Sequence, residues 1–257
     1  MRTMSERTTQ ERLHLSLLGT FKAASHLGAP VRLTMRKPRA LLAFLALHPR
    51  EPQTRERIAA LLWPDTAAAQ ARLNLRQTLF LVRRALGTGL EAIITDVDGS
   101  LGIDPSRVVV DAVEFQKYAR QDTPHALATA GQLYRGDLLQ GFDLGEEPFE
   151  EWLTAERERL RETAIEGLAK LLRHHMDNEE PEAAISVGIR LLALDPCQEA
   201  VHRTLMRLYA VTHRRAAALR QFEACAVALK REFGLEPAEE TRALHGQIAG
   251  ARDLQIA

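Results

Sequence analysis

Residues 68–86 combine a helical repeat of apolar residues with a complete lack of acidic side chains. The residues that recur on one face are Ala71, Leu75, Thr78, Leu79, Val82 and Leu86. At 100° per residue this spacing predicts an amphipathic helix that packs this face on a core and is closed by Gly87. No Asp or Glu stands between Ala67 and Leu90. Since most exposed helices mix both signs of charge, the outer side of this helix is expected to be unusually basic.

The polar side of this helix consists of residues that can contact nucleic acid, namely Arg72, Asn74, Arg76, Gln77, Arg83 and Arg84. Asn and Gln side chains can pair with the edge of adenine, and Arg can pair with guanine or hold a phosphate. The simpler alternative is a solvated basic helix, so the neighbouring elements have to decide between the two interpretations.

Those neighbours follow a recognisable order. The elements expected before the basic helix are a strand at 13–17, a short strand at 31–33, a helix through 40–47 with Pro38 in its first turn, and a helix that begins after Thr54 and stops at Pro64. Thr54 is a good N-cap residue. After the basic helix, Asp98-Gly99 favours a tight turn between two short strands, Ile93–Thr95 and Leu101–Ile103. This order predicts a winged helix-turn-helix in which residues 68–86 enter the major groove and the hairpin is the wing.

The wing has an unusual charge. It carries Asp96 and Asp98, which would repel phosphates, and Arg107 is the nearest basic residue. The segment 96–100 also resembles part of a calcium-binding loop, but Arg107 stands where the closing Glu would be needed. A turn is therefore the preferred interpretation, and no metal site is expected.

The chain is neutral overall, with 34 Lys and Arg against 34 Asp and Glu, but the charges are unevenly distributed. Residues 1–110 hold 16 basic and 9 acidic residues, a net charge of 16 − 9 = +7. Residues 111–257 hold 18 basic and 25 acidic residues, a net charge of 18 − 25 = −7. We therefore predict two domains, 1–110 and 111–257, with a basic surface on the first for an anionic polymer.

The second half is predicted to be all α-helical. Apolar residues from Phe149 to Leu172 fit one long amphipathic helix, whose segment 156–162 is a solvated mixed-charge face. Ala183-Ala184-Ile185 recurs as Ala217-Ala218-Leu219, 34 residues later. A period near 34 with two helices in each unit is typical of tetratricopeptide repeats, which stack into a surface that binds proteins or peptides.

Several other classes of protein are disfavoured. The longest apolar run, Leu41–Leu47, is far too short for a membrane helix, and residues 1–12 lack the apolar stretch of a signal peptide. Cys197 and Cys225 are not spaced as metal ligands, and no nucleotide-binding or nucleophile motif is present. The sequence predicts a cytoplasmic protein that is not an enzyme and needs no cofactor.

The ordered set of motifs resembles the Streptomyces antibiotic regulatory protein (SARP) family. In the first half the matching stretches are RALLAFL at 39–45, RIAALLWPD at 57–65, LRQTL at 75–79 and VRRAL at 82–86. In the second half they are YRGDLL at 134–139, GF at 141–142, EWL at 151–153, ERERLR at 156–161, LDP at 194–196, HRTLM at 202–206, QFEAC at 221–225 and GLEP at 234–237. They cover about residues 13–250.

The resemblance implies a mainly α fold, with an N-terminal OmpR-type winged helix-turn-helix (α+β) followed by an all-α, tetratricopeptide-like bacterial transcriptional activator domain. It also implies a bacterial, nucleoid-associated activator that binds direct repeats in double-stranded DNA as a side-by-side homodimer and contacts RNA polymerase. The sequence departs from the family at the acidic wing, at Val82 in place of a common leucine, and at His213 in place of a glycine. Many relatives continue into further domains, so this chain is expected to be the short two-domain form or a shortened piece.

Residue roles can be assigned on this basis. Gln77 and Asn74, helped by Arg84, are predicted to read bases. Arg72, Arg76 and Arg83 are predicted to hold phosphates. Thr54, at a helix N-terminus, is expected to add a phosphate contact through backbone amides. The alternative hypothesis is a tetratricopeptide-type interaction scaffold whose first half is only structural, and an enzyme is the least favoured class.

Overall fold

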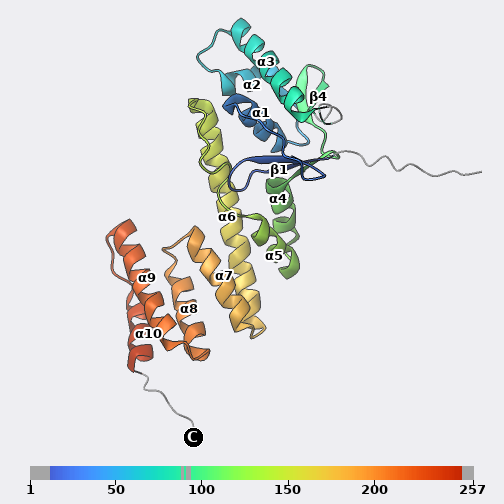
Figure 1. Ribbon diagram of the computed structural model, residues 1–257. Helices are drawn as coiled ribbons and strands as arrows, with labels where there is room; N and C mark the ends of the chain where they lie inside the picture. Colours follow the sequence, from blue (N-terminus) through green and yellow to red (C-terminus); the bar gives the residue numbers. More distant parts are fainter. Residues whose placement is uncertain (1–11, 88–89, 91–93, 251–257) are drawn as a thin grey trace, which may run out of the picture. The chain divides into compact units, whose positions relative to one another are not determined.

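The computed structural model describes residues 12–87, 90 and 94–250 (Figure 1). The chain divides into two compact units, and each unit is made of two segments. Unit 1 comprises Met1–Tyr118 and Gln132–Leu160, and unit 2 comprises Ala119–Gly131 and Arg161–Ala257. The structure is mainly α-helical, with all its strands in unit 1 as far as it is described. The predicted domain division after residue 110 follows charge and sequence motifs, and it stays a prediction.

The first sheet of unit 1 has the strand order β2-β1-β6. Strand β1 (Leu13–Ser16) pairs antiparallel with β2 (Lys22–Ser25) and parallel with β6 (Val108–Val110). The sequence predicts β1, but it does not predict β2, because Lys-Ala-Ala-Ser lacks alternating large apolar residues. The strand expected at 31–33 is wrong: this region makes an isolated bridge between Pro30 and Ala24, since proline has no N–H with which to extend a ladder.

Three helices that pack on one another follow in the chain. Helix α1 (Arg36–Ala46) is buried throughout residues 40–46, and Pro38 lies in its first turn. Helix α2 (Arg55–Leu62) begins after Thr54, whose hydroxyl accepts the backbone N–H of Arg57 at 3.2 Å. Helix α3 (Ala68–Leu86) ends at Gly87, and its buried residues are the six of the predicted core face. The sequence therefore predicts the helix-turn-helix and its cap correctly.

The wing is a three-stranded sheet in the order β3-β5-β4. Strands β4 (Ile94–Val97) and β5 (Ser100–Ile103) are antiparallel. Asp98 and Gly99 join them with φ angles of 49° and 80°, as a type I′ turn requires. The two-residue strand β3 (Gln53–Thr54) adds the N-cap of α2 to the edge of the hairpin. The hairpin is confirmed, while Ile93, predicted to begin it, lies outside the described residues.

Unit 1 also contains residues from the second half of the sequence. The backbone N–H of Leu139 donates to the carbonyl of Leu17 at 2.8 Å. Helix α6 (Glu147–Asp177) contributes residues up to Leu160 to this unit, and the ring of Trp152 packs edge-on against Phe44 of α1, with centroids 5.1 Å apart. These contacts bring the motif at 134–139 beside the residue that follows β1, and the EWL motif onto α1.

A half-buried carboxylate joins β1 to helix α4 (Asp111–Gln121). Asp111 accepts the backbone N–H of Leu17 at 2.7 Å and that of Leu18 at 3.2 Å. Burial raises the pKa of the Asp111 carboxyl, although these hydrogen bonds act in the opposite direction. Asp111 therefore satisfies backbone donors at the end of β1 where the strand leaves the sheet.

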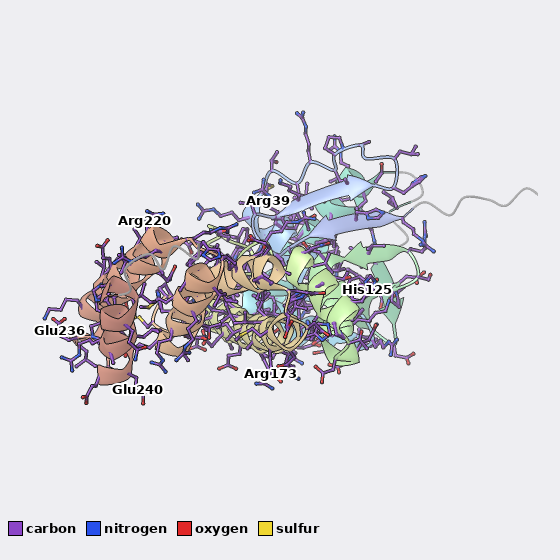
Figure 2. All side chains as sticks on the ribbon, turned by 90° about the horizontal axis from the view of Figure 1, so that it is seen from below. Arg39, His125, Arg173, Arg220, Glu236 and Glu240 are labelled. Carbon is purple, nitrogen blue, oxygen red and sulfur yellow. The ribbon has the colours of Figure 1, made fainter. Side chains whose placement is uncertain are left out.

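Unit 2 consists of helices throughout its described residues. They are the end of α4 from Ala119, α5 (Pro124–Leu133) through Gly131, the later part of α6, α7 (Pro181–Leu194), α8 (Glu199–Val211), α9 (Arg215–Phe233) and α10 (Glu239–Gly250). Leu127, Leu171 and Leu191 form part of one buried cluster, and Met206, Ala218 and Ile248 form another. The charged side chains lie outside these clusters, as Figure 2 illustrates for Glu236 and Glu240 near the start of α10.

The predicted 34-residue period is present in the helix ends of unit 2. After α6, the N–H of Glu180 bonds the carbonyl of His175 at 2.9 Å. After α8, the N–H of Arg214 bonds the carbonyl of Tyr209 at 2.7 Å. Each residue of the second pair lies 34 positions after its counterpart, and both bonds have the geometry of a Schellman helix end. The helix ends that precede α7 and α9 therefore repeat at the 34-residue spacing that the sequence predicts.

Candidate nucleic-acid interface

Helix α3 buries its apolar face and exposes most of the predicted site residues. Arg72, Arg76, Gln77, Arg83 and Arg84 are all exposed to solvent. The helix packs its other side on α1 and α2, so these five side chains occupy the free face of the helix-turn-helix. Among the described residues 68–87 and 90, no acidic side chain offsets their charge.

One flank of α3 forms a row of arginines. Arg72, Arg76 and Arg83 line a groove of about 430 Å³ together with Arg55, the first residue of α2. The floor of the groove is apolar and consists of Leu75, Leu79 and Phe80. We call Arg55, Arg72, Arg76 and Arg83 the arginine row. The charges of Arg72, Arg76 and Arg83 along one groove raise the local concentration of anions, and Arg binds phosphate oxygens through two parallel hydrogen bonds.

The outermost stripe of α3 is of mixed character. Leu73, Gln77, Phe80 and Arg84 follow at the spacing i, i+4, i+7 and i+11, which places them in one line along a helix. We call these four residues the reading stripe. The Phe80 side chain is 62% exposed and that of Leu73 is 42% exposed. The stripe therefore presents an amide, a guanidinium and two apolar groups to whatever approaches α3.

Two predicted site residues are already engaged within the protein. Asn74 is only partly exposed, and its side-chain oxygen accepts the amide of Gln70 at 2.9 Å. The Asn74 amide group retains its donors, so a base contact would have to use them. The Thr54 hydroxyl is committed to the cap of α2, which leaves the backbone amides of the first helical turn as the groups near it that can meet an anion.

The charge of the wing is partly compensated from within unit 1. The guanidinium of Arg55 pairs with the Asp96 carboxylate at 2.5 Å. Arg83 also approaches the wing, with a nitrogen 3.5 Å from the carbonyl of Ile94. One of the two wing acids is therefore neutralised, and Asp98 at the turn remains exposed.

Two residues of the second-half motifs, His202 and Cys225, have roles within the fold of the protein. His202 is buried, with one ring nitrogen 2.9 Å from the Pro196 carbonyl and the other 2.6 Å from the Gln221 amide. Burial raises the pKa of the Cys225 thiol to about 11, which keeps it protonated. Within residues 12–87, 90 and 94–250 no cluster of potential metal ligands occurs, and no helix is long and apolar enough to span a membrane.

Sequence reasoning missed Arg55 and Phe80. Arg55 lies 17 positions before Arg72, the next member of the arginine row, and the turn between α2 and α3 brings it into the same groove. Phe80 could have been found from the sequence, because it is a large apolar residue on the polar side of the helical pattern. Its position there predicts an exposed aromatic side chain on an otherwise hydrophilic face.

Comparisons with known proteins agree with this architecture. Residues 109–249 match the family described as bacterial transcriptional activator domain. The structure is similar to that of EmbR from Mycobacterium tuberculosis, solved in complex with a low-affinity phosphopeptide, with a TM-score of 0.66 and 21% sequence identity. The similarity covers 93% of this chain and 65% of the EmbR chain, so this chain spans less than two thirds of EmbR. The shared fold is the predicted winged helix followed by a helical, tetratricopeptide-like part.

A second solved structure, that of MamA, matches with a TM-score of 0.24 and 12% identity over 76% of this chain and 86% of the MamA chain. A search of curated protein sequences found no match.

Proposed function

The chain belongs to the bacterial transcriptional activator domain family, as its resemblance to SARP regulators predicts, and from that premise we propose that it activates transcription by binding specific DNA sequences through α3. Helix α3 lies in the major groove, and the β4–β5 hairpin lies beside it as the wing. The protein acts in the bacterial cytoplasm, at the nucleoid, and without catalysis.

The single observation that supports this proposal most strongly is the free face of α3. It carries four exposed arginines and an exposed glutamine, and it lacks acidic residues. Exposure to water does not favour an excess of arginines over acidic residues. Binding to a polyanion does favour it, because the arginines release counterions from the phosphates. The adjacent hairpin supplies the second element of a winged helix.

The proposed roles divide along the surface of α3. Gln77 and Arg84, with the remaining donors of Asn74, contact base edges from the reading stripe and its margin. Arg72, Arg76 and Arg83 hold phosphates from the arginine row, which fixes the position of the helix in the groove. Backbone amides beside Thr54 add a phosphate contact at the start of α2.

We further propose that two copies bind side by side on directly repeated promoter elements, and that the acidic second half contacts RNA polymerase. The net charge of −7 over residues 111–257 supports this arrangement, because this half is repelled by DNA and is free to meet protein. Repeat centres separated by a near-integral number of helical turns would place both copies on one side of the duplex.

The proposal is tested by mobility shift with the full chain and the DNA upstream of its own gene. Binding should be strong at about 50 mM salt and much weaker at about 200 mM, since phosphate contacts release counterions. The double variant Gln77→Ala/Arg84→Ala should lose its preference for this DNA over unrelated DNA. If the double variant binds as well and as selectively as the wild type, the assignment of α3 is wrong. A failure of the wild type to bind at either salt concentration would favour the interaction scaffold instead.

A further inference from the structure

We propose that Phe80 recognises the C5-methyl group of a thymine, and that the preferred DNA site therefore contains a thymine one or two base pairs from the base that Gln77 contacts. This inference rests on the proposed function, and it adds an apolar specificity residue that the polar side chains of α3 do not supply.

The starting observation is the position of Phe80 in a basic surface. Its side chain is 62% exposed although it lies in the interior of a 19-residue helix. It separates two hollows of the surface: one is the groove of the arginine row, and the other is lined by Leu73, Arg76, Gln77 and Leu81. Phe80 is thus a ridge between a charged groove and a mainly apolar hollow.

The spacing along α3 determines which base pair Phe80 can reach. Gln77 and Phe80 are neighbours at i and i+3, so their Cβ atoms lie about 5–6 Å apart. Base pairs in a duplex are stacked about 3.4 Å apart. When Gln77 contacts one base, Phe80 therefore faces the next base pair or the one beyond it. Arg84, at i+4 from Phe80, continues the stripe on the far side.

The chemistry of the groove selects the partner of an apolar ring. The thymine methyl is the apolar group that a base pair presents in the major groove, and phenylalanine is among the side chains that contact it. The adjacent Arg76 and Arg83 are in the arginine row, so phosphate contacts there would hold the Phe80 ring down onto the bases. Binding would bury a ring that is otherwise left in water.

A contact with a second copy of the chain is the competing explanation for an exposed aromatic residue. Charge argues against it. A two-fold interface centred on Phe80 would bring the arginines of the two copies against each other, because such an interface joins the same patch on both partners. A polyanion instead neutralises the arginines that surround the ring.

The test begins with selection of DNA from a random pool by the full wild-type chain. Each thymine of the selected site is then replaced singly by deoxyuridine, which removes the methyl group and leaves the hydrogen-bonding edge unchanged. We expect one replacement to weaken wild-type binding about fourfold, the value of burying one methyl group. Phe80→Ala should bind the thymine site more weakly and should not distinguish it from the deoxyuridine site, while Phe80→Leu should retain part of the discrimination.

Val227→Ala is the matched control, because Val227 is an exposed apolar residue, 68% accessible, on α9. It should bind both DNA forms as the wild type does, and circular dichroism should show equal helix content for all variants. The inference is overturned if Phe80→Ala retains the same response to deoxyuridine, or if Phe80→Ala weakens binding to a tandem site but not to a single site. If the wild type selects no sequence at all, the proposed function fails as well, so the two failures are distinguishable.

Discussion

Glu179 and His213, which lie 34 residues apart, share a left-handed backbone conformation, with φ angles of 56° and 57°. Each follows the last residues of a helix and precedes the next helix of unit 2. Glycine is the residue that adopts this conformation without a steric cost. His213 therefore adopts the left-handed conformation at the turn where the SARP resemblance places a glycine. Its Cβ atom makes this conformation less favourable than it is for glycine.

We expect His213→Gly to raise the free energy of unfolding by up to about 1 kcal/mol. The left-handed conformation costs a non-glycine residue about 1–2 kcal/mol, and the greater freedom of glycine in the unfolded chain offsets part of that gain. Urea denaturation measures the difference. Ala224→Gly, at an exposed interior position of α9, is the control and should lower stability by about 1 kcal/mol. Equal losses in both variants would show that residue 213 carries no conformational strain.

Gly188 of α7 is expected to tolerate no side chain. A Cβ atom there would lie 2.8 Å from Cδ2 of Leu205, whose side chain is fully buried and cannot swing away. Gly188→Ala should therefore destabilise unit 2 by about 1–3 kcal/mol through overpacking. Gly246→Ala in α10 is the matched control, since no atom lies within 4 Å of its added Cβ, and it should stabilise by about 0.5–1 kcal/mol. The close approach of α7 and α8 would be disproved by two variants of equal melting temperature.

The stability of unit 1 should depend on pH through Asp111. Burial raises the pKa of this carboxyl in the folded state, so the folded chain holds the proton more tightly than the unfolded chain. Protonation of Asp111 therefore adds to the free energy of unfolding. This contribution is fully present below the ordinary pKa of Asp, and it is lost as pH rises through the raised pKa of the folded state. Asp111→Asn keeps an oxygen for the N–H of Leu17 and does not titrate.

The measurement is the free energy of unfolding of the wild type minus that of Asp111→Asn between pH 3 and pH 7. It should fall as pH rises. A difference that rises with pH would mean that the backbone hydrogen bonds to Asp111 outweigh its burial.

Base-reading and phosphate-holding residues of α3 should differ in how their loss affects binding. Arg83→Ala should weaken binding to all DNA alike and reduce the slope of log affinity against log salt by about one. Gln77→Ala should cost about 1–3 kcal/mol on the selected site and relax the preference at one base pair. Fluorescence anisotropy titrations over a series of salt concentrations separate the two effects.

Two further variants act as controls in this experiment. Arg83→Lys should keep the salt slope because it keeps the charge, and Arg231→Ala on α9 should leave both properties unchanged. The division of roles would be refuted if Arg83→Ala changed the preferred sequence, or if Gln77→Ala changed the salt slope.

The sequence predicts those parts of the fold that depend on local patterns. The bounds and buried face of α3 follow from a regular apolar period that ends in Gly87, and the wing follows from Asp98-Gly99. The sequence does not reveal β3, because two residues give no period and the strand exists through its pairing with β5.

The same limit applies to the candidate site. The arginines of α3 are visible as a run without acids, but the contribution of Arg55 depends on a tertiary turn. The engagement of Asn74 by Gln70 depends on side-chain placement, although the two residues are only one helical turn apart.

Residues 132–160 belong to the same compact unit as residues 1–118, and this limits the order in which unit 1 can fold during synthesis. Leu17 obtains its hydrogen bond from Leu139, and Phe44 obtains its aromatic neighbour when Trp152 has been made. Domains generally fold as units while the chain emerges from its N-terminus. The helix-turn-helix of this chain is translated first, yet its contacts with residues 132–160 can form only after Leu139 and Trp152 have been synthesised.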